Sequence, residues 1–306
     1  MIDVPEVVDL RGGDETFSSL SRRLGTPFIV KGDRSVSGKH CFLIRSTEDY
    51  ERAVLAVGRQ LSTAWEFAAG PSVNFHFVCF SDGVAVFRPT SQILDDSDPL
   101  RPFRFGGSAL GGTVVAGAES AVVAVKRLAT HLDARGYRGV CGVDIILSRR
   151  GSLLVDLNPR FQGSSLLVSQ DILLAGGPPL GEIHIAAVLG ASVRFADEYS
   201  VDRATGREHA SRQLFLRNSR SSDLHVVRTC TDGRYSWKAE SLRWRAPFRP
   251  DDTLSEPDMV LLDLPAEGLR VAPGAPLGRV LLLGESRDPP TVGRLEAAVA
   301  DMLTRR

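Results

Sequence analysis

Two aspartates and an asparagine occupy neighbouring strand-like segments, and their oxygen atoms could hold a metal ion. Asp144 falls in one apolar segment, and Asp156 and Asn158 fall in the next, after the polar turn 148–151. Because alternate residues of a strand share a face, Asp156 and Asn158 point the same way, and Asp144 can lie beside Asp156 on the adjacent strand. Carboxylate and amide oxygens suit Mg²⁺, whose remaining positions are filled by phosphate oxygens and water.

Arg160 extends this set of polar residues, since it shares the face of Asp156 if the strand continues that far. The apolar Val155 and Leu157 would then point the other way, into a core. Arg160 brings a planar, permanently charged set of donors for a phosphate or a carboxylate. The alternative is a solvated hairpin face, in which Arg160 simply pairs with Asp156 and no metal binds.

A lysine followed by a turn rich in glycine and serine is a second candidate for anion binding. Lys31 closes the apolar segment 27–31, and the turn covers 32–39. Glycine and serine expose backbone N–H groups to anionic oxygens, and the lysine supplies charge. The alternative is an ordinary hairpin with a solvated loop.

The string 142–165 resembles the metal-binding signature of the ATP-grasp superfamily, and is most similar to its biotin carboxylase and carbamoyl-phosphate synthetase branch. It shares with that branch an acidic residue, the pattern x-Asn-x-Arg and a tail of small residues. The resemblance implies that Asp144, Asp156 and Asn158 bind Mg²⁺, with Mn²⁺ as an alternative. It also implies that Arg160 acts in catalysis, where it contacts phosphate or the transferring acyl group.

The segment 24–31 and the turn after it resemble the small lid subdomain of ATP-grasp enzymes. In that subdomain the lysine matching Lys31 contacts the nucleotide phosphates. The loop matching 33–39, which includes Ser37 and Gly38, folds over the triphosphate. The resemblance therefore implies that ATP is bound partly by these residues.

The segment 64–75 looks like the hinge between lid and core, where family members pass backbone groups and an acidic residue around the adenine. Glu66 is the candidate for that acidic residue. Many members bind the ribose through a glutamate a few residues later. Ser72 and Asn74 stand in that region here, so this chain departs from the family pattern, and we expect these two residues to contact the nucleotide instead.

The resemblance implies an α+β ATP-grasp fold, in which two subdomains enclose ATP, followed by a β-rich C-terminal extension. We expect a lead-in at 1–26, a lid at 27–70, a core with the metal site at 71–205 and a β-rich region at 206–306. Apolar spacing and capping residues, Asp14 first among them, predict helices at 15–24, 46–60, 119–135, 165–174, 180–189 and 292–303. The stretch 95–113, rich in Asp, Pro and Gly, is predicted to be a loop.

Composition limits the classes of partner. The 306 residues include 37 basic and 37 acidic side chains, so bulk charge favours neither nucleic acid nor a membrane as partner. No apolar run reaches the roughly 18 residues that span a bilayer, and the acidic N-terminus lacks the features of a secretory signal. The four cysteines are dispersed, as in a reduced cytosolic protein. We therefore expect a cytoplasmic location.

Members of the family typically activate a carboxylate as an acyl phosphate, which an amine or a thiol then attacks. The hypothesis for this chain is an ATP-dependent ligase that joins a small-molecule carboxylate to an amine, in metabolite or peptide-bond formation. Gln162, Arg104 and the segment 105–112 are candidates for the acceptor site.

Two alternatives remain open. The chain could be a non-catalytic, nucleotide-binding regulatory subunit. It could also be a carboxylase-like enzyme that activates bicarbonate, with a separate carrier, because no biotinyl Met-Lys-Met motif occurs. Family members usually carry a separate α/β domain before the lid, whereas the lid strand here begins at residue 27. We therefore expect a homodimer, or a partner protein that supplies the missing N-terminal domain.

Overall fold

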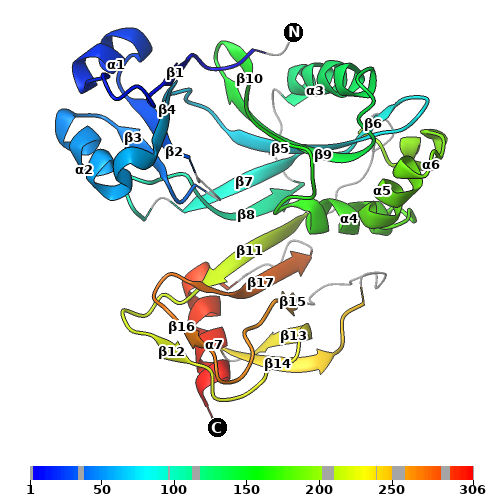
Figure 1. Ribbon diagram of the computed structural model, residues 1–306. Helices are drawn as coiled ribbons and strands as arrows, with labels where there is room; N and C mark the ends of the chain where they lie inside the picture. The colour runs from blue at the N-terminus through cyan, green and yellow to red at the C-terminus, as the bar shows by residue number, and fades with distance from the viewer. Residues whose placement is uncertain are drawn as a thin grey trace.

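The structure is a computed structural model, and it describes residues 3–33, 38–95, 97–111, 118–201, 210–238, 240–249, 259–283 and 290–305. Figure 1 shows a small sheet with two helices (blue), a larger sheet with helices on both faces (cyan to green) and a β-rich C-terminal part (yellow to red). None of the helices in these ranges combines the length and apolar character that crossing a lipid bilayer requires.

The small sheet contains the segment predicted to be the lid, and we call this part of the structure the lid. Its antiparallel strands lie in the order β1 (Val7–Asp9), β4 (Leu61–Glu66), β2 (Phe28–Gly32) and β3 (Cys41–Ile44). The helices α1 (Phe17–Leu24) and α2 (Thr47–Val57), the latter followed by the 3₁₀ turn η1 (Gly58–Gln60), cover one face. Leu20, Phe28, Val30 and Ile44 are fully buried between sheet and helices. The described part of the expected lead-in thus lies within the lid layer.

The core sheet carries the candidate metal residues. Its strands lie in the order β10 (Gly151–Asn158), β9 (Gly139–Ser148), β5 (Ser72–Cys79), β7 (Thr90–Asp95) and β8 (Arg104–Leu110), with β6 (Val84–Val86) paired to β5. Helix α3 (Ala118–Asp133) packs on one face. Helices α4 (Ser165–Leu174), α5 (Leu180–Val188) and α6 (Arg194–Asp197) cover only part of the other.

The C-terminal part continues the core sheet. Strand β11 (Ser211–Arg217) pairs with β8, and β17 (Pro276–Leu283), β15 (Met259–Leu262), β13 (Gly233–Lys238) and β14 (Ser241–Ala246) follow in that order. Strands β12 (Leu224–His225) and β16 (Arg270–Val271) form a separate pair, and α7 (Val292–Thr304) packs on this part. The predicted β-rich C-terminal region and the α+β class are confirmed.

The predicted helices are all present, with shifts of up to three residues at their ends. Helix α1 is capped by Thr16, whose side chain accepts the Ser19 N–H at 3.2 Å, so the prediction of Asp14 as its cap was wrong. Helix α2 is capped by Ser46, whose side chain accepts the Asp49 N–H at 3.3 Å. Strands β1, β4 and β7 and the short helix α6 were not predicted.

The prediction of a loop over 95–113 was wrong for 104–110, which form β8 between β7 and β11. The glycines there allow close packing. A Cβ on Gly107 would lie 2.1 Å from the Gln213 carbonyl oxygen of β11. A Cβ on Gly163 would lie 2.7 Å from the ring of Phe105. Glycine in this stretch therefore marks close approach of neighbouring segments and not a turn.

Candidate functional site

A row of polar side chains crosses three adjacent strands of the core sheet. Asn74 of β5 lies opposite Asp144 of β9, and Asp144 lies opposite Asp156 of β10. Directly opposed residues share a sheet face, so the three side chains point to the same side. The Asn74 amide donates a hydrogen bond to Asp144 Oδ1, and Asn74 Oδ1 accepts one from the Ser164 hydroxyl at 2.7 Å. These contacts fix one end of the row.

A β-bulge at Val155 places Asp156 in this row. Pairing of β10 with β9 is regular from the turn as far as Leu154 and then skips Val155, so that Asp156 opposes Asp144. Regular pairing would instead place Asp156 opposite Val143, whose buried side chain belongs to the cluster under α3. The bulge was not predicted from the sequence, and it decides which face Asp156 occupies.

Asn158 ends β10 on the same face as Asp156, as predicted. It opposes Gly142, is only 9% exposed, and donates from its side-chain amide to Asp156 Oδ2 at 2.9 Å. The structure therefore gathers Asp144, Asp156 and Asn158 on one face of two adjacent strands. The prediction that Leu157 enters a core was wrong, since this side chain is 37% exposed on the edge strand of the sheet.

Asp144 is the electrostatic centre of the row. Burial first, and then the negative charge of Asp156, raise its pKa to about 6. Hydrogen bonds from Asn74 and Gln92 and the positive charge of Lys31 act in the opposite direction. Two adjacent carboxylates in a partly buried place are an arrangement that a bound cation stabilises. The positive charge of Lys31 therefore acts on Asp144 from the lid sheet.

Lys31 lies on the face of the lid sheet that the helices leave uncovered. Phe28 and Val30 of the same strand are fully buried against the lid helices. Lys31 alternates with them along β2 and therefore points to the opposite face. Its ammonium group lies 3.7 Å from the ring centroid of Trp65 on β4.

Gln92 of β7 links Ser72 to Asp144. The Ser72 hydroxyl donates to Gln92 Oε1 at 2.6 Å, and the Gln92 side chain also hydrogen-bonds Asp144. Ser72 therefore lies at the border of the row, on the same face of β5 as Asn74. Gln92 was missed from the sequence because the strand that presents it was not predicted.

The segment between β10 and α4 is anchored to the sheet face that carries the polar row. The Gln162 amide lies over Gly142, where a Cβ would come within 2.2 Å of it, and donates to the Phe75 carbonyl at 3.4 Å. Ser165 Oγ accepts the Gln162 N–H and also contacts Nε2 of the buried His76, both at 2.8 Å. Gln162 is thus fixed beside the candidate metal strands.

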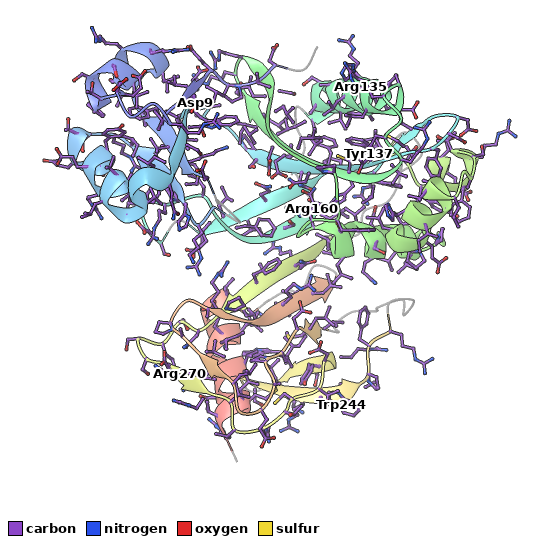
Figure 2. The ribbon with its side chains drawn as sticks, viewed as in Figure 1. Asp9, Arg135, Tyr137, Arg160, Trp244 and Arg270 are labelled. Atoms are coloured by element: carbon purple, nitrogen blue, oxygen red, sulfur yellow. The ribbon has the colours of Figure 1, made fainter. Side chains whose placement is uncertain are left out.

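Glu66 and Arg160 lie at the margins of the site. Glu66 ends β4 and forms an ion pair with Arg150 at 2.6 Å, which ties the hinge to the turn between β9 and β10. Strand β10 ends at Asn158, so strand alternation does not align Arg160 with the row, contrary to the sequence-based expectation. The Arg160 side chain is exposed near the start of α4 and donates to the Phe161 carbonyl at 2.9 Å (Figure 2).

The glycine-rich loop touches the connection between β7 and β8. Gly38 has a φ of +74°, and a Cβ there would lie 2.0 Å from the Phe103 carbonyl oxygen. Ser37, the other candidate in this loop, lies outside the described residues. Arg104 lines a pocket of about 480 Å³ with Gly38 and Arg217, and no member of the polar row lines this pocket. Arg104 therefore faces a space apart from the candidate metal residues.

The donor atoms of the site fit a hard cation. Two carboxylates and the amide of Asn158 offer oxygen ligands, whereas the Asn74 oxygen is turned toward Ser164. Over the ranges that the structure describes, no group of three or more His, Cys, Asp or Glu side chains gathers as a metal site. A cation at Asp144 and Asp156 would thus need oxygen ligands from phosphate or water, as Mg²⁺ prefers.

Comparisons with known proteins identify the family and the fold. Residues 3–164 match a family model described as an ATP-grasp domain. A search of curated proteins finds no match.

Solved structures share the fold, and three of them show which kinds of enzyme have it. Carboxyaminoimidazole ribonucleotide synthase from Aspergillus clavatus, complexed with ATP, is 16% identical over 99% of this chain and 70% of its own, with a TM-score of 0.61. An L-amino acid ligase from Bacillus licheniformis is 13% identical over 98% and 67%, with a TM-score of 0.57. The biotin carboxylase domain of Hydrogenobacter thermophilus 2-oxoglutarate carboxylase, with MgADP and bicarbonate, is 13% identical over 92% and 58%, with a TM-score of 0.61.

Proposed function

Because this chain belongs to the ATP-grasp family, we propose that it is an ATP-dependent ligase that joins a carboxylate to an amine. In the first step a carboxylate oxygen of the substrate attacks the γ-phosphorus of ATP, which forms an acyl phosphate and releases ADP. In the second step the amine nitrogen attacks the acyl carbon, and phosphate leaves with the bonding electron pair. The amine loses one proton, and the product is an amide.

The observation that carries this proposal is the polar row on the open face of the core sheet, opposite Lys31. Asp144, Asp156 and Asn158 would hold Mg²⁺, which neutralises charge on the phosphate oxygens when it is bound. Lys31 approaches from the lid and supplies a positive charge that already influences Asp144. An anionic triphosphate between the two surfaces would meet positive charge from both sides.

Other residues of the site have supporting roles in this proposal. Asn74 and Gln92 hold the Asp144 carboxylate through side-chain hydrogen bonds, which fixes its orientation. Arg160 is exposed beside the row, and its remaining guanidinium N–H groups can stabilise the acyl phosphate or its tetrahedral adduct. Ser72, Gly38 and the hinge around Glu66 would border the nucleotide.

The test is a screen for ADP release over pairs of carboxylates and amines in the presence of Mg²⁺. Asp156→Asn keeps the size of the side chain and removes its charge, so it should abolish the release. Asp14→Asn alters an exposed aspartate of the lid layer and serves as the matched control. Equal ADP release by the wild type and Asp156→Asn would contradict the proposal.

Two further outcomes separate the alternatives. A bicarbonate-dependent release of ADP that needs no amine would favour a carboxylase-like reaction, as the fold shared with a bicarbonate-bound carboxylase domain suggests. Binding of MgADP without ADP release by any pair would favour a regulatory nucleotide-binding subunit. Replacement of Mg²⁺ by Mn²⁺ in the same assay tests the second metal.

A further inference from the structure

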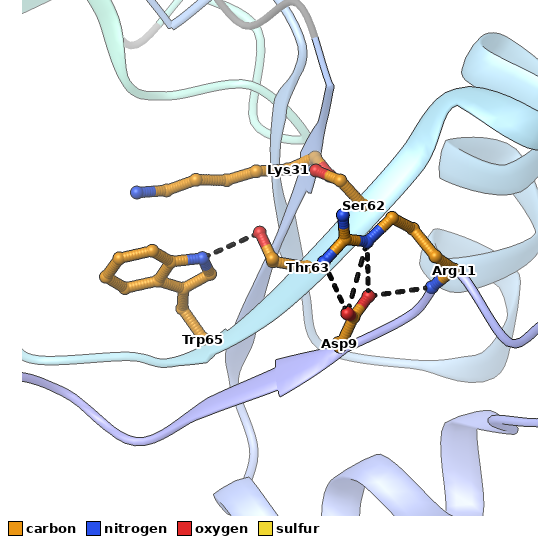
Figure 3. Close-up of polar contacts among 6 residues, drawn as sticks. All are labelled: Asp9, Arg11, Lys31, Ser62, Thr63 and Trp65. Carbon is orange, nitrogen blue, oxygen red and sulfur yellow. Dashed lines mark hydrogen bonds and ion pairs between the residues drawn. The ribbon is translucent and has the colours of Figure 1, made fainter.

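The lysine that faces the carboxylate row has an aromatic partner. The Lys31 ammonium group lies 3.7 Å from the centroid of the Trp65 ring, and Figure 3 shows the side chain running along the ring face. An ammonium group over the face of an indole is attracted by the negative charge of the π system, and tryptophan gives the strongest such contact. This contact holds the long lysine side chain in one direction.

The pairing of the lid strands places the two side chains together. Lys31 of β2 lies directly opposite Thr63 of β4, and Trp65 is two residues further along β4, so Trp65 is a diagonal neighbour of Lys31 on the same face. The Trp65 indole N–H donates to Thr63 Oγ1 at 2.8 Å (Figure 3). The hydrogen bond fixes the tilt of the ring and therefore the surface that it offers to the ammonium group.

A carboxylate on the same face of the lid sheet as Lys31 is already engaged. Asp9 of β1 also opposes Thr63, from the other side, about 10 Å from Lys31 by strand spacing. Its carboxylate binds the Arg11 guanidinium through contacts of 2.6–3.1 Å, and these hydrogen bonds lower the pKa of Asp9 to about 2. Among the residues that the structure describes, Lys31 forms no ion pair.

An aromatic partner has a different consequence from a carboxylate partner. A carboxylate would neutralise Lys31 and would have to be displaced before a phosphate could bind. The ring orders the ammonium group and leaves its full positive charge, and this charge reaches Asp144 across the site. We propose that Trp65 is a positioning residue, which holds Lys31 extended on the open lid face so that it can receive a nucleotide phosphate. This inference rests on the nucleotide-binding part of the proposed function and does not depend on the substrates that are joined.

The test measures binding of a non-hydrolysable ATP analogue with Mg²⁺ by calorimetry. Trp65→Leu removes the π face and keeps apolar bulk, and should raise the Kd about 3- to 10-fold. Trp65→Phe keeps a weaker π face, so its Kd should lie between those of the wild type and Trp65→Leu. Fluorinated tryptophans incorporated at position 65 alone keep the shape of the ring and weaken its π face stepwise, so the logarithm of Kd should rise with each fluorine.

A second series separates positioning from a purely structural role. In a Lys31→Met background the same fluorinated series should give a constant Kd, because the charged partner of the ring is gone. A flat series in the wild-type background, or wild-type affinity in Trp65→Leu, would overturn the inference. Binding of the analogue is measured without turnover. A protein that binds the analogue but joins no substrates would therefore refute the ligase reaction, and the fluorinated series would still test the role of Trp65. A wild-type protein that binds no nucleotide would refute both.

Discussion

For Asp144, the stability of the metal-free fold and the binding of a metal favour opposite protonation states. Its burial and the neighbouring Asp156 raise its pKa to about 6, so the ionised carboxylate destabilises the metal-free fold at neutral pH. Metal binding, in contrast, requires the ionised form. A side chain that costs stability in the absence of ligand is expected where function determines the residue type.

Asp144→Asn should therefore stabilise the metal-free protein and abolish binding of the magnesium–nucleotide complex. An asparagine can still accept the hydrogen bond from Asn74, while the charge is removed. We expect a gain of about 1–3 kcal/mol in the free energy of unfolding at pH 8 in the presence of a chelator. Chemical denaturation measures the gain, and Asp14→Asn should show neither effect. A metal-free variant less stable than the wild type would contradict this account.

His76 should make the fold sensitive to acid. It is completely buried, contacts Ser165 through Nε2, and its Nδ1 has no hydrogen-bond partner in the described part of the chain. Burial lowers its pKa to about 3. As the pH falls from 7.5 to 5, the unfolded chain takes up a proton near pH 6.5 and the folded protein does not, so stability falls by about 2 kcal/mol through this residue.

The measurement is the free energy of unfolding of wild type and His76→Gln at pH 7.5 and 5. The substitution can lower stability at both values because it disturbs the core, but it should reduce the loss between them by about 2 kcal/mol. Parallel losses in the two proteins would show that His76 does not titrate on unfolding in this range.

At the scale of elements, a glycine of β8 allows close approach of the core to the C-terminal part, where β8 pairs with β11. A Cβ on Gly107 would lie 2.1 Å from the Gln213 carbonyl oxygen, so Gly107→Ala forces β8 and β11 apart. We expect a loss of about 2–4 kcal/mol in the free energy of unfolding. Gly181→Ala is the matched control, since nothing lies within 4 Å of its added Cβ and alanine favours the helix α5. An equal effect of the two substitutions would refute the close contact.

The sequence predicted elements better than it predicted their pairing. Helix α4 begins at Ser165 and ends at Leu174, where it was predicted. Asp156 and Asn158 were placed on one face because strand alternation is a local property. Strand β8 was taken for a loop because its glycines Gly106 and Gly107 serve close contacts with β7 and β11, which only the folded chain reveals.

The same limit applies to the site. The bulge at Val155 has no local signal, yet it puts Asp156 on the face of Asp144. Gln92 could not be assigned to the site because its strand was not predicted, and its role depends on pairing between distant segments. Arg160 was aligned with the row on the assumption of a longer strand, and β10 ends two residues earlier. Most of the site features that were not predicted from the sequence therefore depend on pairing between distant segments.

At the scale of the whole molecule, the described residues show several attachments of the lid to the core, of which the bridge between Asp3 and Leu153 of β10 is one and the following two are the best defined. The hinge after β4 is held by the ion pair between Glu66 and Arg150. The connection between β7 and β8 provides the second attachment. The Leu43 N–H donates to the Leu100 carbonyl at 2.8 Å, and the Leu100 side chain is buried in the lid core. Arg45 also donates to the Pro99 carbonyl at 2.8 Å. The segment 97–103 is therefore packed with the lid and should move with it.

Hydrogen exchange should show this division. The lid has its own hydrophobic cluster, whereas the core and the C-terminal part share one continuous sheet. We expect amides of the lid and of 97–103 to exchange together and faster than those of β5 and β9. Addition of a magnesium–nucleotide complex should slow both lid groups to the same extent, because the ligand binds across the lid and the core.

Leu100→Ala tests whether the attachment is real. Loss of a buried leucine from the lid core should destabilise the lid by about 2–4 kcal/mol and speed exchange throughout its strands. Exchange in β5 and β9 should not change, because Leu100 makes no part of the clusters around those strands. Val123→Ala, at an exposed position of α3, is a suitable control for a loss of apolar bulk. If Leu100→Ala accelerated exchange only within 97–103, that segment would be a surface connection and would not be part of the lid.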